Sequence, residues 1–108
     1  MSDKKTRRCM RASFTYADDS KNAHRLMINH ECWAGTMIMG RLIDSMNEMN
    51  KGCGFSIDES VIREAEEMKE MFERHEPADK LSYKEYARLD AVLIDIEEKV
   101  KIELWRGD

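Results

Sequence analysis

Apolar side chains recur at intervals of three and four residues near the end of the chain, which is the spacing of one face of an α-helix. The positions on this face are Tyr86, Leu89, Leu93, Ile96, Val100 and Leu104. A second apolar line on the same segment consists of Ala87, Ala91, Ile94 and Trp105. Ser82 and Glu85 have the spacing of a capping box, and Leu81 and Tyr86 that of a hydrophobic staple. The pattern predicts a helix over about 83–105 that packs against two partners.

A narrower apolar stripe predicts a shorter helix over about 57–75. Its members, at spacings of four, three and four, are Val61, Ala65, Met68 and Phe72. Ser56 and Glu59 again have the capping-box spacing, and Pro77 favours an end near His75. The face opposite the stripe is acidic and carries Glu59, Glu66, Glu70 and Glu73. We therefore expect one face of this helix to be buried and the other to be solvated.

The segment from about residue 20 to residue 50 is apolar around much of its circumference. This pattern is typical of a central helix with several neighbours. Polar residues at 18–20 offer N-caps for it. Gly35 and Gly40 indicate either a close contact with another helix or a break near 35–40. The two alternatives stay open on the sequence alone.

Ahead of this segment, residues 10–16 alternate between apolar and polar side chains, which predicts a short strand. They lie in a basic N-terminal arm, residues 1–17, whose cations are Lys4, Lys5, Arg7, Arg8 and Arg11. Such an arm binds nucleic acid or an acidic partner, or serves as a solvated terminus. With a helical domain over 18–108, the predicted fold is all-α: a three- to four-helix antiparallel bundle that carries the arm and forms a dimer.

Composition narrows the class of protein. A length of 108 residues is typical of one compact domain, and one Pro with five Gly favours helices over a turn-rich β-fold. The net charge of −4 hides an asymmetry, because residues 1–13 sum to +4 and residues 56–108 to −7. Three cysteines without a C-x-x-C pair do not form a secreted disulfide framework, and no apolar stretch is long enough to span a membrane. We expect a cytoplasmic protein without membrane contact.

The residue types that commonly bind metals or catalyse reactions do not form a recognisable site in this sequence. His24, His30 and Cys32 lie within nine residues. On a continuous helix, however, the two histidines diverge by about 120°, so they do not converge on one ion. Glu64 and Glu67 form the E-x-x-E half of the magnesium site of all-helical pyrophosphohydrolases, without the E-x-x-D half. We expect no metal, no cofactor and no catalysis.

One alternative rests on the spacing of Arg25 and His30. This R-x4-H spacing resembles that of all-helical ribonucleases of the HEPN type. The resemblance implies cleavage of RNA at a site to which two protomers contribute. Leu26 departs from the family, which usually has a polar residue after the arginine. On a regular helix the two side chains would also diverge by about 140°.

The function that the surface pattern favours is protein–protein interaction. Five methionines are concentrated on the segment 20–50: Met27, Met37, Met39, Met46 and Met49. Flexible thioethers suit adaptable apolar contacts with a partner, although they also fill cores. The residues we expect to bind the partner are Met37, Met46, Met49, Ile94 and Trp105. The predicted function is that of a regulator or inhibitor that binds another protein or a second copy of itself, and a phage-type accessory protein is one interpretation of its origin.

A second alternative is a DNA-binding regulator. Residues 54–65 resemble the turn and second-helix start of ribbon-helix-helix repressors, and the predicted strand would supply the β-ribbon. That resemblance implies a dimer whose Arg11, Ser13 and Thr15 read the major groove. The departure is the 38 residues between strand and turn, about twice the length that the family uses.

Overall fold

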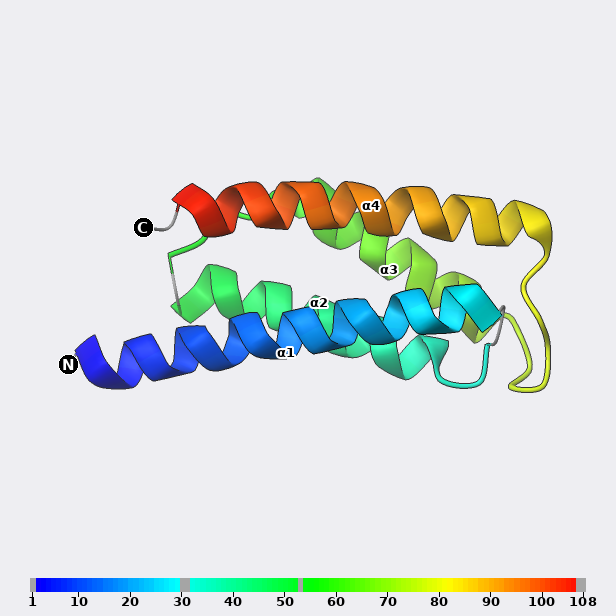
Figure 1. Ribbon diagram of the computed structural model, residues 1–108, viewed down its shortest axis with the longest axis horizontal. Helices are drawn as coiled ribbons and strands as arrows, with labels where there is room; N and C mark the ends of the chain where they lie inside the picture. Colours follow the sequence, from blue (N-terminus) through cyan, green and yellow to red (C-terminus); the bar gives the residue numbers. More distant parts are fainter. Residues whose placement is uncertain (1, 30–31, 53, 107–108) are drawn as a thin grey trace.

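The computed structural model describes the backbone of residues 2–29, 32–52 and 54–106, and the side chains of 11, 13–29, 32–52 and 54–101. Four helices make up the fold: α1 (Ser2–Asn29), α2 (Gly35–Gly52), α3 (Glu59–Glu73) and α4 (Tyr83–Arg106). Each runs opposite to the helix before it (Figure 1). Helix α1 packs on α2 and α4, and α3 packs on the same two helices. The prediction of an all-α bundle is confirmed, as a four-helix arrangement measuring 47 × 20 × 19 Å.

The start of α4 is the capping box that the sequence predicts. The Ser82 N–H donates to Oε1 of Glu85 at 3.0 Å, and the Glu85 N–H donates to Oγ of Ser82 at 3.2 Å. Two backbone donors that a helix start leaves without an intrahelical partner are thereby satisfied. Leu81 is buried and Tyr86 packs against the core, at the positions of the predicted staple. Local sequence therefore determines where α4 begins.

Helix α3 begins later than its predicted capping box. Its N-cap is Asp58, whose carboxylate accepts a hydrogen bond of 2.9 Å from the Ser60 N–H, so the prediction of Ser56 as the cap is wrong. Residues 54–58 are not helical, and within them Ile57 is buried and its backbone is bound by the side chain of Asn50, at 2.8 and 3.0 Å. The predicted stripe along α3 is buried: Val61, Ala65, Met68 and Phe72.

The predicted strand at residues 10–16 is wrong, because α1 is helical from Ser2 onwards. Apolar and small positions also follow the helical spacing here. Tyr16, Ser20, Ala23 and Met27, at intervals of four, three and four, are all buried against the bundle. Phe14, which the strand would have faced inwards with Tyr16, is 65% exposed. Helix α1 therefore runs through the predicted domain boundary at residue 17, and residues 18–20 are interior helix positions rather than caps.

The break in the segment 20–50 falls earlier than predicted. Helix α1 ends at Asn29 and α2 starts at Gly35, so residues 35–40 are helical. Gly35 itself is a close-contact position, because a Cβ built on it would lie 2.2 Å from Cδ1 of Phe72 on α3. Gly40 has more room, with the nearest side-chain atom, Cε of Lys69, at 3.8 Å.

The core runs the length of the bundle and draws on all four helices. Its largest fully buried side chains are Met39, Leu42, Met46, Met49, Met68, Leu89, Leu93, Ile96, Val61 and Val100. Four of these are methionines, so thioethers fill much of the space between α2, α3 and α4. Over the part of the chain that the structure describes, no helix combines the length and hydrophobicity that crossing a bilayer requires.

Candidate interaction surface

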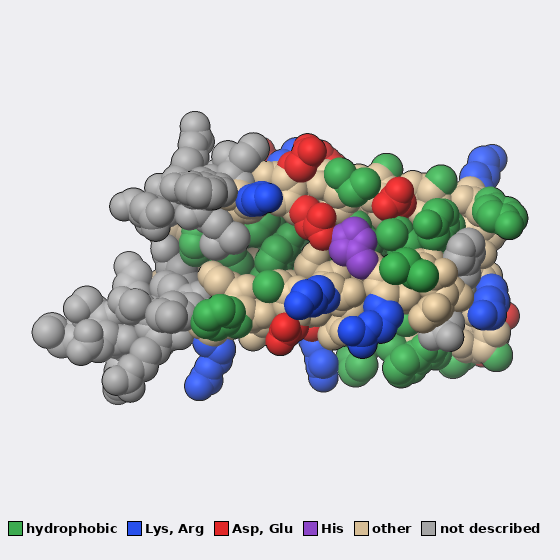
Figure 2. Space-filling view, viewed as in Figure 1, with side chains coloured by type: hydrophobic (Ala, Val, Ile, Leu, Met, Phe, Trp, Pro, Cys, Tyr) green, Lys and Arg blue, Asp and Glu red, His purple; other side chains and the backbone are tan. Residues whose placement is uncertain are grey.

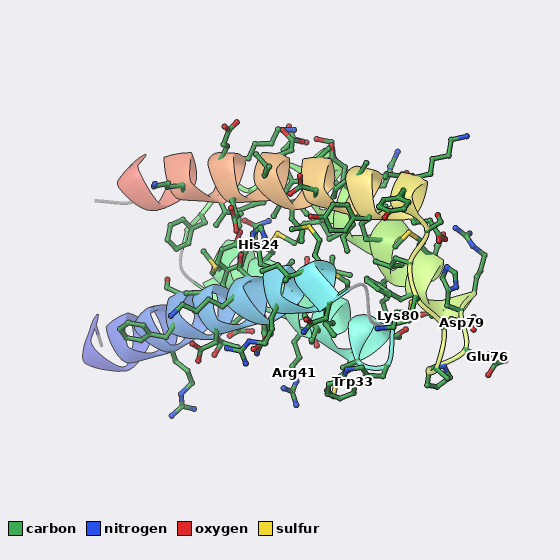
Figure 3. All side chains as sticks on the ribbon, turned by 45° about the vertical axis from the view of Figure 1, so that its right-hand side comes forward. His24, Trp33, Arg41, Glu76, Asp79 and Lys80 are labelled. Carbon is green, nitrogen blue, oxygen red and sulfur yellow. The ribbon has the colours of Figure 1, made fainter. Side chains whose placement is uncertain are left out.

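Three large apolar side chains are exposed where α1 turns into α2. Ile28 in the last turn of α1 is 70% exposed, Trp33 in the connecting turn 64%, and Met37 in the first turns of α2 51%. We call these three residues the α1–α2 apolar surface. The Trp33 side chain projects away from the bundle (Figure 3). Figure 2 shows hydrophobic side chains gathered at this end of the molecule beside Lys and Arg side chains.

Local structure directs these side chains outwards. In α1 the positions just before Ile28, Leu26 and Met27, are buried, so Ile28 falls on the outer side of the helix. In the turn, Cys32 and Ala34 are buried on either side of Trp33. The Gly35 N–H donates to the carbonyl of Cys32 at 3.1 Å and tightens this turn. The buried neighbours Cys32 and Ala34 thus fix the Trp33 side chain in an exposed position.

Two cationic side chains border this surface, beside the carboxylates of Asp79 and Glu85. Burial, and next the charges of Glu85 and Asp79, raise the pKa of the Cys32 thiol. Arg25 is exposed one turn before Ile28, and the spacing of three places both residues on the same side of α1. Nζ of Lys80, from the loop between α3 and α4, donates to the carbonyl of Asn29 at 3.4 Å. Figure 3 shows Lys80 and Trp33 at the same end of the bundle. Positive charge therefore borders the α1–α2 apolar surface from both α1 and the α3–α4 loop.

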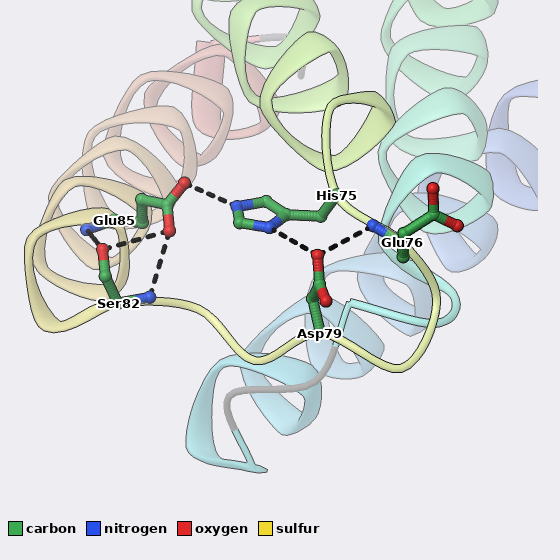
Figure 4. A network of polar contacts seen from close by, with 5 residues as sticks. All are labelled: His75, Glu76, Asp79, Ser82 and Glu85. Carbon is green, nitrogen blue, oxygen red and sulfur yellow. Dashed lines mark hydrogen bonds and ion pairs between the residues drawn. The ribbon is translucent and has the colours of Figure 1, made fainter.

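Two carboxylates, Asp79 of the α3–α4 loop and Glu85 in the first turn of α4, are engaged in internal contacts (Figure 4). Asp79 accepts from the backbone N–H of Glu76 at 3.0 Å and contacts Nδ1 of His75 at 3.4 Å. Glu85 accepts from Ser82 and contacts Nε2 of His75 at 2.6 Å. These hydrogen bonds raise the pKa of His75 and lower the pKa of Glu85. Asp79 and Glu85 are thus tied to His75, while Lys80 contacts the last residue of α1, next to Ile28.

Only some of the residues predicted to bind a partner are on the surface. Met37 and Ile94 are exposed, the latter by 46%. Met46 and Met49 are fully buried in the core, so their assignment to a partner-binding surface is wrong. Their side of α2 is covered by α3, which the pattern of one segment does not reveal. Helix α4 includes Trp105, whose side chain lies outside the described residues.

The basic residues of the predicted arm belong to the first three turns of α1. Arg11 is exposed. The side chains of Lys4, Lys5, Arg7 and Arg8 lie outside the described residues. Since α1 is helical at residues 10–16, these residues do not supply the β-ribbon of the ribbon-helix-helix interpretation.

A polar contact joins α1 to α4 beside a crevice of about 350 Å³. Oε1 of Glu97 accepts from Oγ of Ser20 at 2.8 Å and lies 2.5 Å from Nε2 of His24. The hydroxyl of Tyr16, which also lines the crevice, is buried without a hydrogen-bond partner. Burial, and next the charge of Glu97, raise the pKa of Tyr16, which keeps the phenol protonated.

The residues considered for catalysis or metal binding are spread over different contacts. His24 is held by Glu97, Cys32 is buried, and His30 lies outside the described residues, as does the R-x4-H pair that needs it. Glu67 forms an ion pair of 3.1 Å with Arg88, and Glu64 one of 3.9 Å with Lys99. Among the residues that the structure describes, no three His, Cys, Asp or Glu side chains are placed to hold one metal ion.

Ile28 and Trp33 are the surface residues that sequence reasoning missed. Both lie in a segment that looks apolar on most sides, so the pattern predicts a buried position for them. The position of the turn that contains residues 32–34 decides their exposure. The chain has no significant match among protein-family models, curated proteins or solved structures.

Proposed function

We propose that this chain acts by binding another protein through the α1–α2 apolar surface, as a regulator or inhibitor without catalysis of its own. The observation that carries the proposal is the exposure of Ile28, Trp33 and Met37 at one turn. Exposed apolar side chains gathered at one place are characteristic of interaction sites. Trp is among the residues that contribute most to binding energy at protein interfaces.

The two bordering cations define the chemistry of the partner. Arg25 and Lys80 border the apolar surface, while the nearby carboxylates of Asp79 and Glu85 are tied to His75. The partner is therefore a protein segment with apolar side chains flanked by carboxylates. Rim charges of this kind mainly accelerate association, and apolar anchors mainly slow dissociation.

Site-specific photo-crosslinking tests the proposal. A photoreactive phenylalanine analogue replaces Met37, and in a control protein it replaces Glu66, an exposed residue of α3. Crosslinking is done in the native host, and the product of each position is identified by mass spectrometry. A protein that is crosslinked from position 37 and not from position 66 is then purified for binding measurements.

The affinity between this chain and the purified crosslinked protein decides the test. We expect Ile28→Ser and Met37→Ser each to weaken binding about tenfold, which corresponds to about 1.4 kcal/mol, and Glu66→Gln to leave it unchanged. The double variant Arg25→Glu, Lys80→Glu should slow association most at low salt. Unchanged affinity in Ile28→Ser and Met37→Ser would overturn the proposal. Crosslinks between two copies from position 37 would replace the foreign partner by a homodimer.

Nucleic-acid binding by α1 is a second candidate function. The helical backbone of α1 places positions 4, 7, 8 and 11, all Lys or Arg, on one face by their spacing. A basic helical face binds phosphates in a salt-dependent manner. We expect the affinity for a short DNA or RNA duplex to fall with salt and to drop further in Arg11→Ala. Salt-independent binding, or none, would exclude this candidate.

A further inference from the structure

A groove of about 660 Å³ lies between α1 and α2, and polar side chains line all of it. Helix α1 contributes Arg11, Thr15, Asp18, Asp19 and Asn22, and helix α2 contributes Arg41, Asp44, Ser45 and Glu48. An apolar ligand would find no apolar side chain here. The groove is therefore suited to a charged or strongly hydrogen-bonding group.

The charges of the groove favour a cation. Its lining holds four carboxylates and two guanidinium groups. Helices α1 and α2 are antiparallel (Figure 1). Arg11 and Arg41 therefore lie toward opposite ends of the groove, since Arg11 is in the first half of α1 and Arg41 in the first half of α2. The carboxylates occupy the part between them. A single cationic group fits that central part, whereas a long polycation would meet an arginine at either end.

Asp19, in the wall of the groove, has a carboxylate oxygen without a donor. This side chain is 4% exposed, and its Oδ2 is buried without a hydrogen-bond partner. A buried carboxylate oxygen without a donor is unfavourable, and a ligand N–H that reached it would relieve that penalty. Burial, and to a lesser extent the charge of Asp18, raise the pKa of Asp19 against the opposing effect of Arg41.

The arrangement favours a guanidinium over a metal ion. The carboxylates are spread along two helices, and the described residues offer no three acidic, His or Cys side chains around one point. A guanidinium is flat and carries five N–H donors, so it reaches acceptors that are several ångströms apart. The oxygens of Thr15, Asn22 and Ser45 add neutral acceptors to the same lining.

We propose that the groove between α1 and α2 binds a single guanidinium group through Asp19, Asp18 and Asp44. The group comes from an arginine side chain of a peptide or from a small free guanidine. This site does not depend on the α1–α2 apolar surface, because the two share no residue.

Titrations of the full chain followed by NMR test the proposal. The probes are methylguanidinium, N-acetyl-arginine amide and N-acetyl-citrulline amide, which is a neutral analogue of the arginine probe. We expect saturable shifts of the Asn22 side-chain amide and the Ser45 backbone amide with the first two probes, and binding at least tenfold weaker with citrulline. Tighter binding of the arginine amide than of methylguanidinium identifies a peptide source, and equal binding a free guanidine.

Variants separate the site from general charge attraction. Asp19→Asn keeps the shape of the side chain and should weaken binding of N-acetyl-arginine amide at least tenfold. Asp44→Asn, at an exposed position that is safe for folding, should weaken it severalfold, and Glu66→Gln on α3 should have no effect. Equal binding of arginine and citrulline probes, or equal losses in Glu66→Gln and Asp44→Asn, would overturn the proposal.

The pH dependence gives a readout that needs no variant. A bound guanidinium favours ionised Asp19, so affinity should rise as pH increases through the raised pKa of that carboxyl. The other charged groups of the groove are Asp18 and Arg11 of α1 and Arg41, Asp44 and Glu48 of α2, of which Arg41 and Asp18 act on the pKa of Asp19. Asp19→Asn should remove this rise at mildly acidic pH. An affinity that is independent of pH in the unaltered chain would contradict a role for Asp19.

Discussion

His75 and Glu85 connect the loop after α3 to the first turn of α4, with 2.6 Å between Nε2 and Oε2. The contact raises the pKa of the imidazole and, together with the Ser82 N–H, lowers the pKa of the carboxyl. Both shifts indicate that the fold favours the ionised pair. The pair thus links the stability of the bundle to pH.

Replacement of His75 should reveal this link. Its contribution is full below its ordinary pKa of 6.5 and is lost as pH rises through the raised value in the fold. The contribution of Glu85 is full above its ordinary pKa of 4.5 and is lost as pH falls through its lowered value. We expect His75→Gln to lower the free energy of unfolding by about 0.5–1 kcal/mol near pH 5.5, and by less near pH 9. Urea denaturation at both pH values measures the two losses in free energy of unfolding. Equal losses at pH 5.5 and pH 9 would contradict the link to His75.

Gly35 and Gly40 form a matched pair of sites on α2. We expect Gly35→Ala to destabilise the protein by about 1–3 kcal/mol, because its Cβ would overlap the ring of Phe72. Gly40→Ala adds a Cβ at ordinary contact distance and improves helix propensity, so it should stabilise by up to about 1 kcal/mol. Thermal denaturation of both variants gives the comparison. Losses of similar size would show that Gly35 is not a close-contact position.

The methionines of α2 should separate into two classes. Met46 is fully buried, so Met46→Ala should lower the free energy of unfolding by about 2–5 kcal/mol. Met37 is half-exposed, and Met37→Ala should change it by less than about 0.5 kcal/mol. Chemical denaturation distinguishes the two values. A large loss in Met37→Ala would mean that its side chain is covered in solution, by a second copy for example.

The Asn50 side chain should stabilise the segment that connects α2 and α3. Its side chain donates to the carbonyl of Ile57 at 3.0 Å and accepts from the Ile57 N–H at 2.8 Å. Asn50→Ala removes both hydrogen bonds and should destabilise by about 1–3 kcal/mol. Asn50→Asp keeps only the hydrogen-bond acceptor, so its free energy of unfolding should lie between those of the unaltered chain and Asn50→Ala. Hydrogen exchange at the Ile57 amide provides a local check, since its protection should fall in Asn50→Ala and persist in Asn50→Asp.

Sequence reasoning succeeded where neighbouring residues carry the information. Helix α4 is defined by its capping box and by apolar positions within each turn, and its boundaries agree with the prediction to within a residue. Residues 10–16 are different, because their alternation predicts a strand, whereas the buried side of α1 follows positions 16, 20, 23 and 27. Farther along α1, Ser20 and His24 contact Glu97, which is more than 70 residues away.

The interaction surface was predictable only in part for a related reason. The abundance of methionine on α2 is visible in the sequence, and Met37 is indeed exposed. Which methionines are covered depends on where α3 crosses α2, and Met46 is on the covered side. The exposure of Trp33 follows from a turn whose position the apolar pattern does not reveal. Tertiary packing, rather than periodicity, assigns these side chains to core or surface.

The order of the helices has a consequence for the rate at which the chain folds. Each helix packs on the next one along the sequence, so most contacts need only a short loop to close, as in helical bundles that fold in about microseconds to milliseconds. The contact of α1 with α4 is the exception, since Ser20 and Glu97 are 77 residues apart. We expect the helical hairpins to form first and this seam to close last. We therefore also expect the native bundle to open most readily along this seam, beside the crevice that Tyr16 lines.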